Sequence, residues 1–271
     1  MLFRSQIAHR SVGISIGVQQ MVRSDLGCAG VAFTLEPETG FRDLVVIHGS
    51  WGLGESVVQG RVTPDEYTLH KPSLRAGKRA IVRREVGDKG VQMVYAAGSG
   101  SGVEQAPVPA LQRRARVLTD DEVLTLGRYA LAIEDHYAKR AGKPVPMDLE
   151  WAKDGRTGEL FVLQARPETV HAPVQDPSLH TYRLSQKGAV LLRGRSVGTK
   201  IGAGPVRILR SGADLAAFRT GEVLVAAMTD PDCESVLKRA AAVVTDQGGR
   251  TCHAAILSRE LGDRKSTRLN S

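Results

Sequence analysis

Short apolar stretches separated by glycine and proline turns dominate the first third of the chain. Runs that are rich in β-branched residues and bounded by turn formers are typical of strands. Within residues 12–95 we therefore predict strands at ISIGVQQMV, AGVAFTL, DLVVIHG, DEYTLHK, RAIVRREV and VQMVYA. No apolar run approaches the ~20 residues that a membrane-spanning helix needs. The beginning of the sequence also lacks the apolar stretch of a secretory signal, so we expect no association with a membrane.

A different period marks one long helix after residue 119. Thr119 followed by Glu122 is a capping-box pattern, which predicts the start of the helix. Apolar side chains then recur at helical spacing, at Val123, Leu126, Ala130, Ile133 and Tyr137. Gly142 and Pro144 predict where the helix ends.

Two strand-like segments, PMDLEW and ELFVLQARPE, flank a turn-rich stretch and predict a β-hairpin. If the hairpin is symmetric about residue 157, Glu150 stands opposite Gln164 and Asp148 opposite Arg166. Such a face offers oxygen ligands for Mg²⁺ and a guanidinium for phosphate. We expect the other face to be buried, with Leu149, Trp151, Phe161, Leu163 and Ala165. Spacing alone favours an ordinary surface hairpin with cross-strand ion pairs.

The second half of the chain predicts a separate unit. Residues 171–183 are rich in proline and polar side chains and have no clear period, as is typical of a linker. Strands are expected near GPVRIL, GEVLVA and AAVVTD, and a helix is expected to begin close to His253. Because strands and helices mix in both halves, the fold class is α/β or α+β.

The run Gly-Gly-Arg-Thr-Cys-His, residues 248–253, lies between that last strand and that helix. A neutral imidazole at a helix start can act as a nucleophile, and neighbouring backbone amides can receive an anion. Arg250 adds positive charge, so His253 could carry a phosphoryl group. A capping or partly buried histidine in a glycine turn would give the same pattern.

A second glycine-rich segment, residues 49–55, follows a strand-like run. It matches neither the P-loop pattern nor G-x-G-x-x-G, so a tight structural turn is the favoured interpretation.

Composition excludes several classes of function. The net charge of +8 is scattered along the chain, and aromatic residues make up 4%, too few for a base-stacking platform. We therefore expect no nucleic-acid partner. The three cysteines form no C-x-x-C motif, which argues against a disulfide framework and a structural zinc site. A reducing compartment, the cytoplasm, fits this usage.

Three stretches taken together resemble the phosphoenolpyruvate synthase (pyruvate, water dikinase) family. They are VQQMVRSDLGCAGVAFTLEPETGFRDLVVIHGSWGLGESVVQGRVTPDEY, PMDLEWAKDGRTGELFVLQARPETV and MTDPDCESVLKRAAAVVTDQGGRTCHAAILSRELG. The resemblance implies a partial ATP-grasp domain at 1–171, a linker at 172–184 and an incomplete, swivelling phosphohistidine domain at 185–262. It does not extend over 263–271, which we interpret as a non-native tail.

The resemblance also implies a chemistry that uses ATP and Mg²⁺. ATP would give its β-phosphoryl group to a histidine through a pyrophosphorylated intermediate, with release of AMP and phosphate. Pyruvate would then accept the phosphoryl group in a separate barrel domain and become phosphoenolpyruvate. By motif match, His253 is the carrier, flanked by Gly249, Arg250 and Thr251.

The same match assigns the nucleotide site. Glu150 and Gln164 would be ligands of Mg²⁺, and Arg166 would contact the phosphates. The strand that would lie by the adenine comprises Val46, Ile47, His48 and Gly49. Thr251 matches a threonine that can be a regulatory phosphorylation site, although its hydroxyl could equally cap the helix.

The partners implied are ATP and pyruvate, a regulatory kinase or phosphorylase acting at Thr251, and a second copy of the parent enzyme as a homodimer. The start of the ATP-grasp domain and the pyruvate-binding barrel have no counterpart in the sequence, so we expect this chain alone to be inactive. Pyruvate phosphate dikinase and rifampicin phosphotransferase belong to the same swivelling class and remain alternatives. A non-catalytic nucleotide-binding or carrier module is an alternative of another class.

Overall fold

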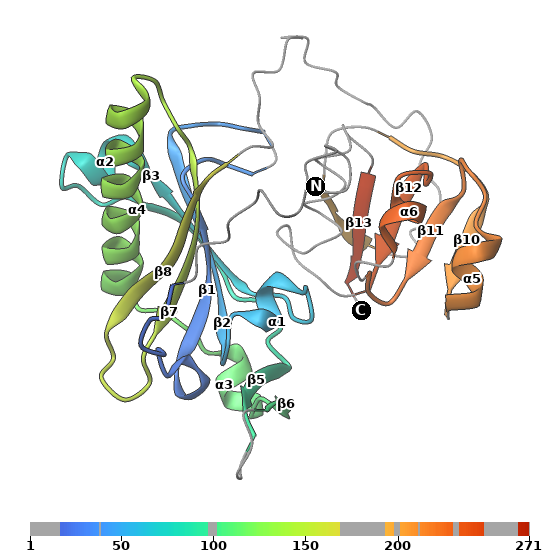
Figure 1. Cartoon of the computed structure of the whole chain (residues 1–271), viewed down its shortest axis with the longest axis horizontal. Helices are drawn as coiled ribbons and strands as arrows, with labels where there is room; N and C mark the ends of the chain where they lie inside the picture. Colours follow the sequence, from blue (N-terminus) through green and yellow to red (C-terminus); the bar gives the residue numbers. More distant parts are fainter. Residues whose placement is uncertain are drawn as a thin grey trace, which may run out of the picture.

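Two units make up the described part of the computed structural model (Figure 1). The description covers residues 17–37, 39–96, 102–168, 193–197, 201–210, 212–229, 233–246 and 265–270. The first unit ends at residue 168, and the second begins at residue 193. The predicted linker at 172–184 lies outside the described residues.

A six-stranded antiparallel sheet forms the body of the first unit, in the order β4-β3-β2-β1-β7-β8. Its strands are β1 (Cys28–Phe33), β2 (Leu44–Trp51), β3 (Asp65–His70), β4 (Ile81–Glu85), β7 (Met147–Lys153) and β8 (Leu160–Pro167). The central strand β1 is buried along its whole length. At Gly30 a Cβ atom would lie 1.9 Å from the carbonyl oxygen of His48, so this position admits no side chain.

One face of this sheet is covered by α4 (Asp120–Ala141), with α2 (Lys71–Arg75) at its side (Figure 1). The predicted capping box is present: Thr119 accepts a hydrogen bond from the Glu122 amide, and the Glu122 carboxylate accepts one from the Thr119 amide. Gly142, with φ of 64°, ends the helix as predicted. Side chains from α4 and the strands form the main hydrophobic core.

The opposite face is covered over part of its area by smaller elements. These are α1 (Glu55–Val58), the two-stranded sheet β5 (Val91–Tyr95) with β6 (Val103–Pro107), α3 (Ala110–Arg114) and the 3-10 helix η3 (Ser24–Leu26). A second hydrophobic cluster lies here and joins β1 to α1 and β5.

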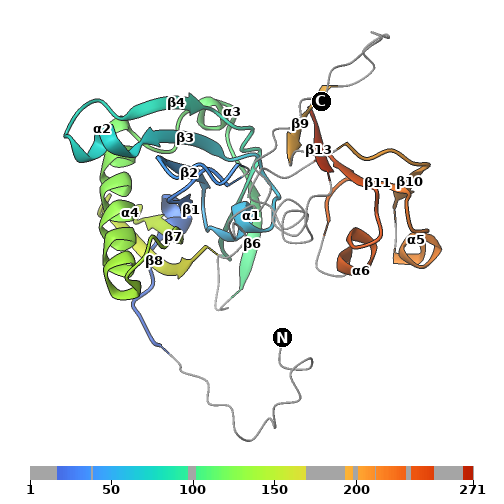
Figure 2. The same cartoon turned by 90° about the horizontal axis from the view of Figure 1, so that it is seen from above.

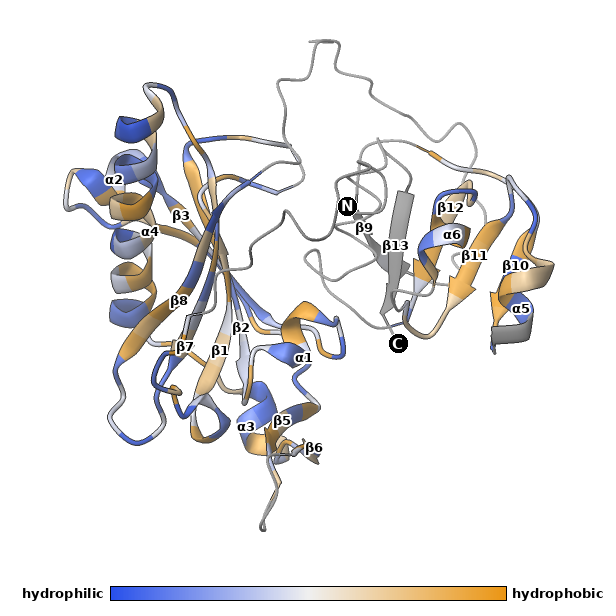
Figure 3. Cartoon of the chain, viewed as in Figure 1, coloured by the Kyte–Doolittle hydropathy of each residue, from blue (hydrophilic) through white to orange (hydrophobic). Residues whose placement is uncertain are grey.

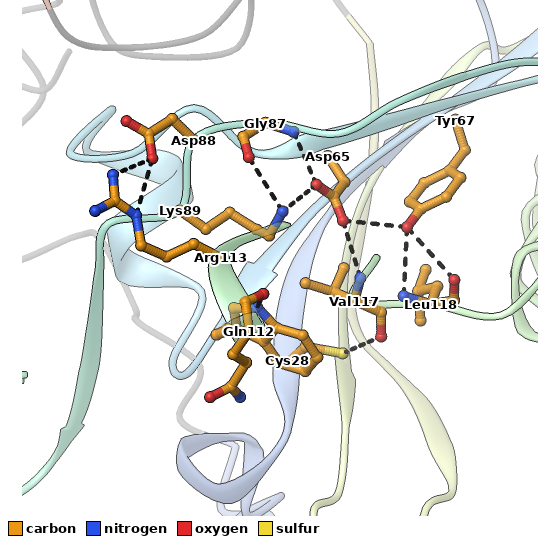
Figure 4. A network of polar contacts seen from close by, with 11 residues as sticks. Cys28, Asp65, Tyr67, Gly87, Asp88, Lys89, Gln112, Arg113, Val117 and Leu118 are labelled. Atoms are coloured by element: carbon orange, nitrogen blue, oxygen red, sulfur yellow. Dashed lines mark hydrogen bonds and ion pairs between the residues drawn. The ribbon is translucent and has the colours of Figure 1, made fainter. Parts of the chain in front are cut away.

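Asp65, the first residue of β3, binds groups from several other segments of the first unit (Figure 4). Its carboxylate pairs with the Lys89 ammonium and accepts hydrogen bonds from the amides of Gly87 and Val117 at 2.9 Å each. The Tyr67 hydroxyl donates to it at 3.3 Å. The segments that lead into β5 and α4 are thereby tied to the main sheet.

The second unit is built around a five-stranded sheet in the order β10-β11-β12-β13-β9. The strands β10 (Val206–Leu209), β11 (Val223–Ala226), β12 (Ala242–Thr245) and β13 (Lys265–Asn270) are parallel, and β9 (Arg193–Val197) is antiparallel to β13. With α5 (Gly212–Ala217) and α6 (Glu234–Leu237) they enclose a small core around Leu224 and Leu237. Figure 3 shows β10, β11 and β12 largely in hydrophobic colours.

The structure corrects part of the predicted element map. Residues 17–22 of the first predicted strand have no regular secondary structure, and Val18 is 97% exposed, because no neighbouring strand pairs with them. The predicted strand at 65–71 stops at His70, where α2 begins. The glycine-rich segment forms the expected turn, with Gly52 at φ of 80°. No helix in the described residues is long and apolar enough to cross a membrane.

Candidate functional site

The predicted hairpin exists, and as far as Glu150 its register is the one expected from the sequence. Strands β7 and β8 pair Glu150 with Gln164 and Asp148 with Arg166. Directly opposed residues of an antiparallel pair project to the same face. The two carboxylates, the amide and the guanidinium therefore share one face of the sheet, the face opposite α4.

The symmetry ends one residue later. A β-bulge between Glu150 and Trp151 shifts the register, so that Trp151 stands opposite Val162. The extra residue reverses the alternation of side chains in β8. Phe161 and Leu163 were expected on the buried face, which is wrong: they are 39% and 37% exposed. Leu149 and Trp151 are buried in the main core, as predicted, and Ala165 packs against it.

A row of side chains crosses the sheet on the face opposite α4. Neighbouring strands align Glu66 with His48, His48 with Val31, Val31 with Glu150, and Glu150 with Gln164. The His48 ring nitrogen Nε2 lies 3.5 Å from the Glu66 carboxylate, and both side chains are buried. One strand, β1, therefore lies between the predicted adenine strand β2 and the hairpin that carries the predicted metal ligands Glu150 and Gln164.

The four residues predicted to lie by the adenine divide between the two faces. Val46 aligns through Phe33 with Asp148, on the face of the hairpin's polar side chains. Ile47 faces α4 and belongs to the main core. A Cβ atom at Gly49 would lie 2.8 Å from the ring of Trp151, so Gly49 also faces that core. The structure brings Val46 and His48 to the candidate face and turns the other two away.

Arg166 forms an ion pair at this face. Its Nε and Nη2 atoms lie 2.8 and 2.7 Å from Oδ2 of Asp148. Burial raises the pKa of Asp148, and the hydrogen bond from Arg166 opposes that rise. The same hydrogen bond raises the pKa of Arg166. The Arg166 side chain is 61% exposed, so its remaining donors can reach a ligand from outside.

A pocket of about 440 Å³ opens beside Glu150. Its walls come from residues 19–24, β1, the turn before α1, α1 itself and the hairpin, with Ala29, Leu53, Val58, Trp151 and Leu163 among the apolar residues. Glu55 and Gln59 also line it. Glu55 was not among the residues predicted from the sequence, although its place directly after a glycine turn was a usable signal.

The residues present fit a magnesium site in which protein and nucleotide would each supply part of the ligands. No hydrogen bond engages the side chain of Glu150 or Gln164 in the described part of the chain, so their oxygens are available as ligands. Among the described residues, no three His, Cys, Asp or Glu side chains are placed to hold a metal ion by themselves. Mg²⁺ commonly takes one or two protein carboxylates and completes its shell with substrate phosphates and water. This donor set suits a nucleotide-bound ion.

The predicted carrier motif lies elsewhere in the chain. Gly249, Arg250, Thr251 and His253 are outside the described residues. The strand before them, β12, is present at Ala242–Thr245, as the sequence predicted.

Comparison with known families decides the class of the first unit. A family model described as "Pyruvate phosphate dikinase, AMP/ATP-binding domain" matches residues 2–185, more than half of the chain. The chain belongs to this AMP/ATP-binding family. A second model, "PEP-utilising enzyme, mobile domain", matches residues 218–262. The AMP/ATP-binding family thus accounts for the unit that holds Glu150 and Gln164, and the mobile-domain match includes β12.

The curated relatives of this AMP/ATP-binding chain include proteins named phosphoenolpyruvate synthase. Phosphoenolpyruvate synthase of Pseudomonas aeruginosa (strain UCBPP-PA14) is 50% identical over 94% of the chain and 32% of its own length. The Escherichia coli (strain K12) protein of that name is 50% identical, over 94% of the chain and 31% of its own length. A probable phosphoenolpyruvate synthase of Pyrococcus horikoshii is 36% identical, over 94% and 30%. The chain therefore spans about a third of the length of these relatives.

Proposed function

We propose that the chain is the nucleotide-binding and phosphoryl-carrying part of a phosphoenolpyruvate synthase. The parent reaction converts ATP, pyruvate and water to AMP, phosphoenolpyruvate and phosphate. One observation carries the proposal. In a chain of an AMP/ATP-binding family, Glu150 and Gln164 stand opposite each other, with Arg166 beside them, on the face of the sheet that lies away from α4.

The residues of the first unit would bind and orient the nucleotide. Mg²⁺ bound with ATP neutralises phosphate charge and makes the phosphorus more open to attack. Glu150 and Gln164 would supply protein oxygens to the ion, and Arg166 would hold a phosphate oxygen. Asp148 fixes the guanidinium through its two contacts at 2.8 and 2.7 Å, so little conformational entropy is lost when a phosphate arrives.

His253 would be the phosphoryl acceptor. A neutral ring nitrogen would form the new bond to the β-phosphorus as the bond to the AMP oxygen breaks, so AMP leaves with the electron pair and a pyrophosphoryl group stays on the ring. Water would then displace the phosphorylated ring group at the γ-phosphorus, which releases inorganic phosphate and leaves one phosphoryl group on His253. Gly249 and Arg250 would stabilise the charge on the transferred group, and Thr251 would be a site of regulatory phosphorylation. This assignment rests on the motif Gly-Gly-Arg-Thr-Cys-His and on the mobile-domain match at 218–262.

The proposed domain organisation follows from the same assignment. Residues 1–171 would be part of an ATP-grasp domain, 172–184 a linker and 185–262 a swivelling carrier. Residues 263–271 would be a non-native tail, although β13 within them pairs with β12 and β9 of the carrier's sheet. A carrier that visits two distant sites needs such a linker. The parent enzyme would be a cytoplasmic homodimer, and Val46 and His48 would lie near the adenine. Support comes from the separation of the described chain into two units, each with its own sheet and core.

The test uses β-³²P-ATP and a full-length enzyme that contains these residues. We expect acid-labile label on the protein, and we expect pyruvate to release it as phosphoenolpyruvate. His253→Ala should abolish labelling, whereas His136→Ala, at an exposed histidine of α4, should leave it unchanged. Label retained in His253→Ala would assign the carrier role to another residue.

The same assay separates the alternatives. A phosphoenolpyruvate synthase forms AMP without added inorganic phosphate, whereas a pyruvate phosphate dikinase requires it. A rifampicin phosphotransferase would pass the label to the antibiotic and leave pyruvate untouched. A non-catalytic binding module would bind ATP and take up no label.

A further inference from the structure

The two units meet at a second hollow, which is separate from the pocket beside Glu150, here called the nucleotide pocket because the proposed function places ATP there. The hollow has a volume of about 270 Å³. Its walls from the first unit are Arg61, Val62, Thr63, Asp88, Gly90, Val91 and Gln105, and Met228 of the second unit completes it. In both views the second unit lies on the side of the first unit that carries α1, away from α4 (Figures 1 and 2).

The chemistry of this hollow resembles a small interface for reversible contact. Val62 is buried and belongs with Val91 to the cluster that packs on β1, so the floor is apolar and fixed to the sheet. Arg61, Asp88 and Gln105 form a polar rim. An apolar centre with a polar rim is typical of protein interfaces, and contacts between domains of one chain are usually of the transient kind.

Met228 suits a reversible contact. It lies two residues after the end of β11 and stays 37% exposed, although it borders the hollow. An unbranched thioether side chain adapts to irregular surfaces and can enter and leave a hollow at small cost. The next residue, Thr229, is buried, which fixes the base of the segment.

We propose that this hollow is the docking seat of the second unit on the nucleotide-binding unit, occupied by the segment 227–229 through Met228, and that Arg61 links the seat to the nucleotide pocket. The proposal deepens the proposed function and rests on it for the identity of the ligand. It assigns the hollow as the surface used in the docked state, and Arg61 as the residue through which nucleotide binding affects docking.

A chain of hydrogen bonds connects the two sites. Gln59 donates to Glu55 at 2.6 Å, and both residues line the nucleotide pocket. Arg61 donates from Nε to Gln59 at 2.6 Å and from Nη1 to Gln105 at 3.3 Å. The Arg61 guanidinium is planar and rigid. A shift of Gln59 toward a bound nucleotide therefore also moves Nη1, which donates to Gln105 at the rim of the seat. Two sites that bias one such element are energetically coupled.

Cross-linking tests the seat on the whole chain. Asp88→Cys with Met228→Cys places one thiol on each side of the hollow, in a Cys252→Ser background, and a short bismaleimide is the probe. The Asp88 side chain is 64% exposed, so a thiol there can react. Cys28 and Cys233 are buried and should not react. The control pair combines Asp88→Cys with Ile201→Cys, an exposed apolar position of the second unit outside the seat. We expect intramolecular cross-linking at least several-fold faster for 88–228, and equal rates would overturn the seat.

Addition of nucleotide tests whether Arg61 couples the nucleotide pocket to the seat. Mg·ATP should increase the 88–228 rate several-fold, because the carrier must dock when nucleotide is present. Arg61→Met should remove this response, so that the rates with and without nucleotide become equal, whereas Arg114→Met, at an exposed arginine of α3, should preserve it. A full response in Arg61→Met overturns the link.

The two failures remain distinguishable. If calorimetry detects no binding of Mg·ATP, the nucleotide part of the proposed function fails, while the comparison of 88–228 with 88–201 without nucleotide still decides the seat.

Discussion

Asp120, the first residue of α4, lies between two guanidinium groups. Arg84 donates to its two oxygens at 3.0 and 2.7 Å, and Arg116 donates to Oδ1 at 2.7 Å. The hydrogen bonds from Arg84 are the largest cause that lowers the pKa of Asp120 from 3.8 to about 2. A carboxyl whose pKa is lowered on folding stabilises the protein above its unfolded pKa and loses that effect as the pH falls toward the folded value.

The pH dependence of Asp120→Asn follows from this sign. At pH 7 the variant should lose up to about 1 kcal/mol of unfolding free energy, since the pair is partly exposed. The difference from wild type should shrink between about pH 4 and pH 2. Urea unfolding followed by tryptophan fluorescence measures it, because both tryptophans, Trp51 and Trp151, lie in the first unit. Asp121→Asn, one residue along the same turn, is the control. An equal loss of unfolding free energy for Asp120→Asn at neutral pH and at acidic pH would contradict the account.

At the scale of elements, the Asp65 network joins parts of the chain that lie far apart in sequence. Asp65 and Lys89 are both 0% exposed, and together with Gly87 and Val117 they connect β3 to the segments before β5 and α4 (Figure 4). A buried ion pair contributes little net stability by itself, but removal of one partner leaves an uncompensated charge.

Lys89→Met should therefore lower the unfolding free energy by about 3–5 kcal/mol. The double variant Asp65→Asn with Lys89→Met should recover part of the loss, because no buried charge is left. Urea unfolding provides the measurement. Arg75→Met removes a cation from an exposed pair with Asp135 and should cost less than about 1 kcal/mol. If Lys89→Met costs no more than Arg75→Met, the network does not have the role described.

Elements with a clear local signal could be predicted from the sequence. The helix α4 combines a period of 3.6 residues with a capping box, and the hairpin combines alternation with a short turn, so its register followed from symmetry. The bulge opposite Glu150 could not be predicted, because no glycine or other turn former marks Leu163, the extra residue of β8. Helices of four or five residues, such as α1 and α2, are too short to show a period.

At the scale of the whole molecule, a polar, proline-rich stretch between two regions with their own apolar patterns predicts two units. The contact between the units could not be predicted. It brings Arg61 and Met228, 167 positions apart, to one hollow, and neither residue has a local pattern that marks it. The same holds for Glu55, which lines the pocket beside Glu150 from α1.

The central claim is that the polar face of the hairpin binds a magnesium–nucleotide complex. Isothermal titration of the chain with ATP in the presence of Mg²⁺ tests it most directly. Glu150→Gln should weaken binding by about tenfold or more, because it removes the charged ligand of the ion. Glu159→Gln makes the same change at an exposed position of the same hairpin and should bind as wild type does. Equal affinities for Glu150→Gln and Glu159→Gln would contradict the claim.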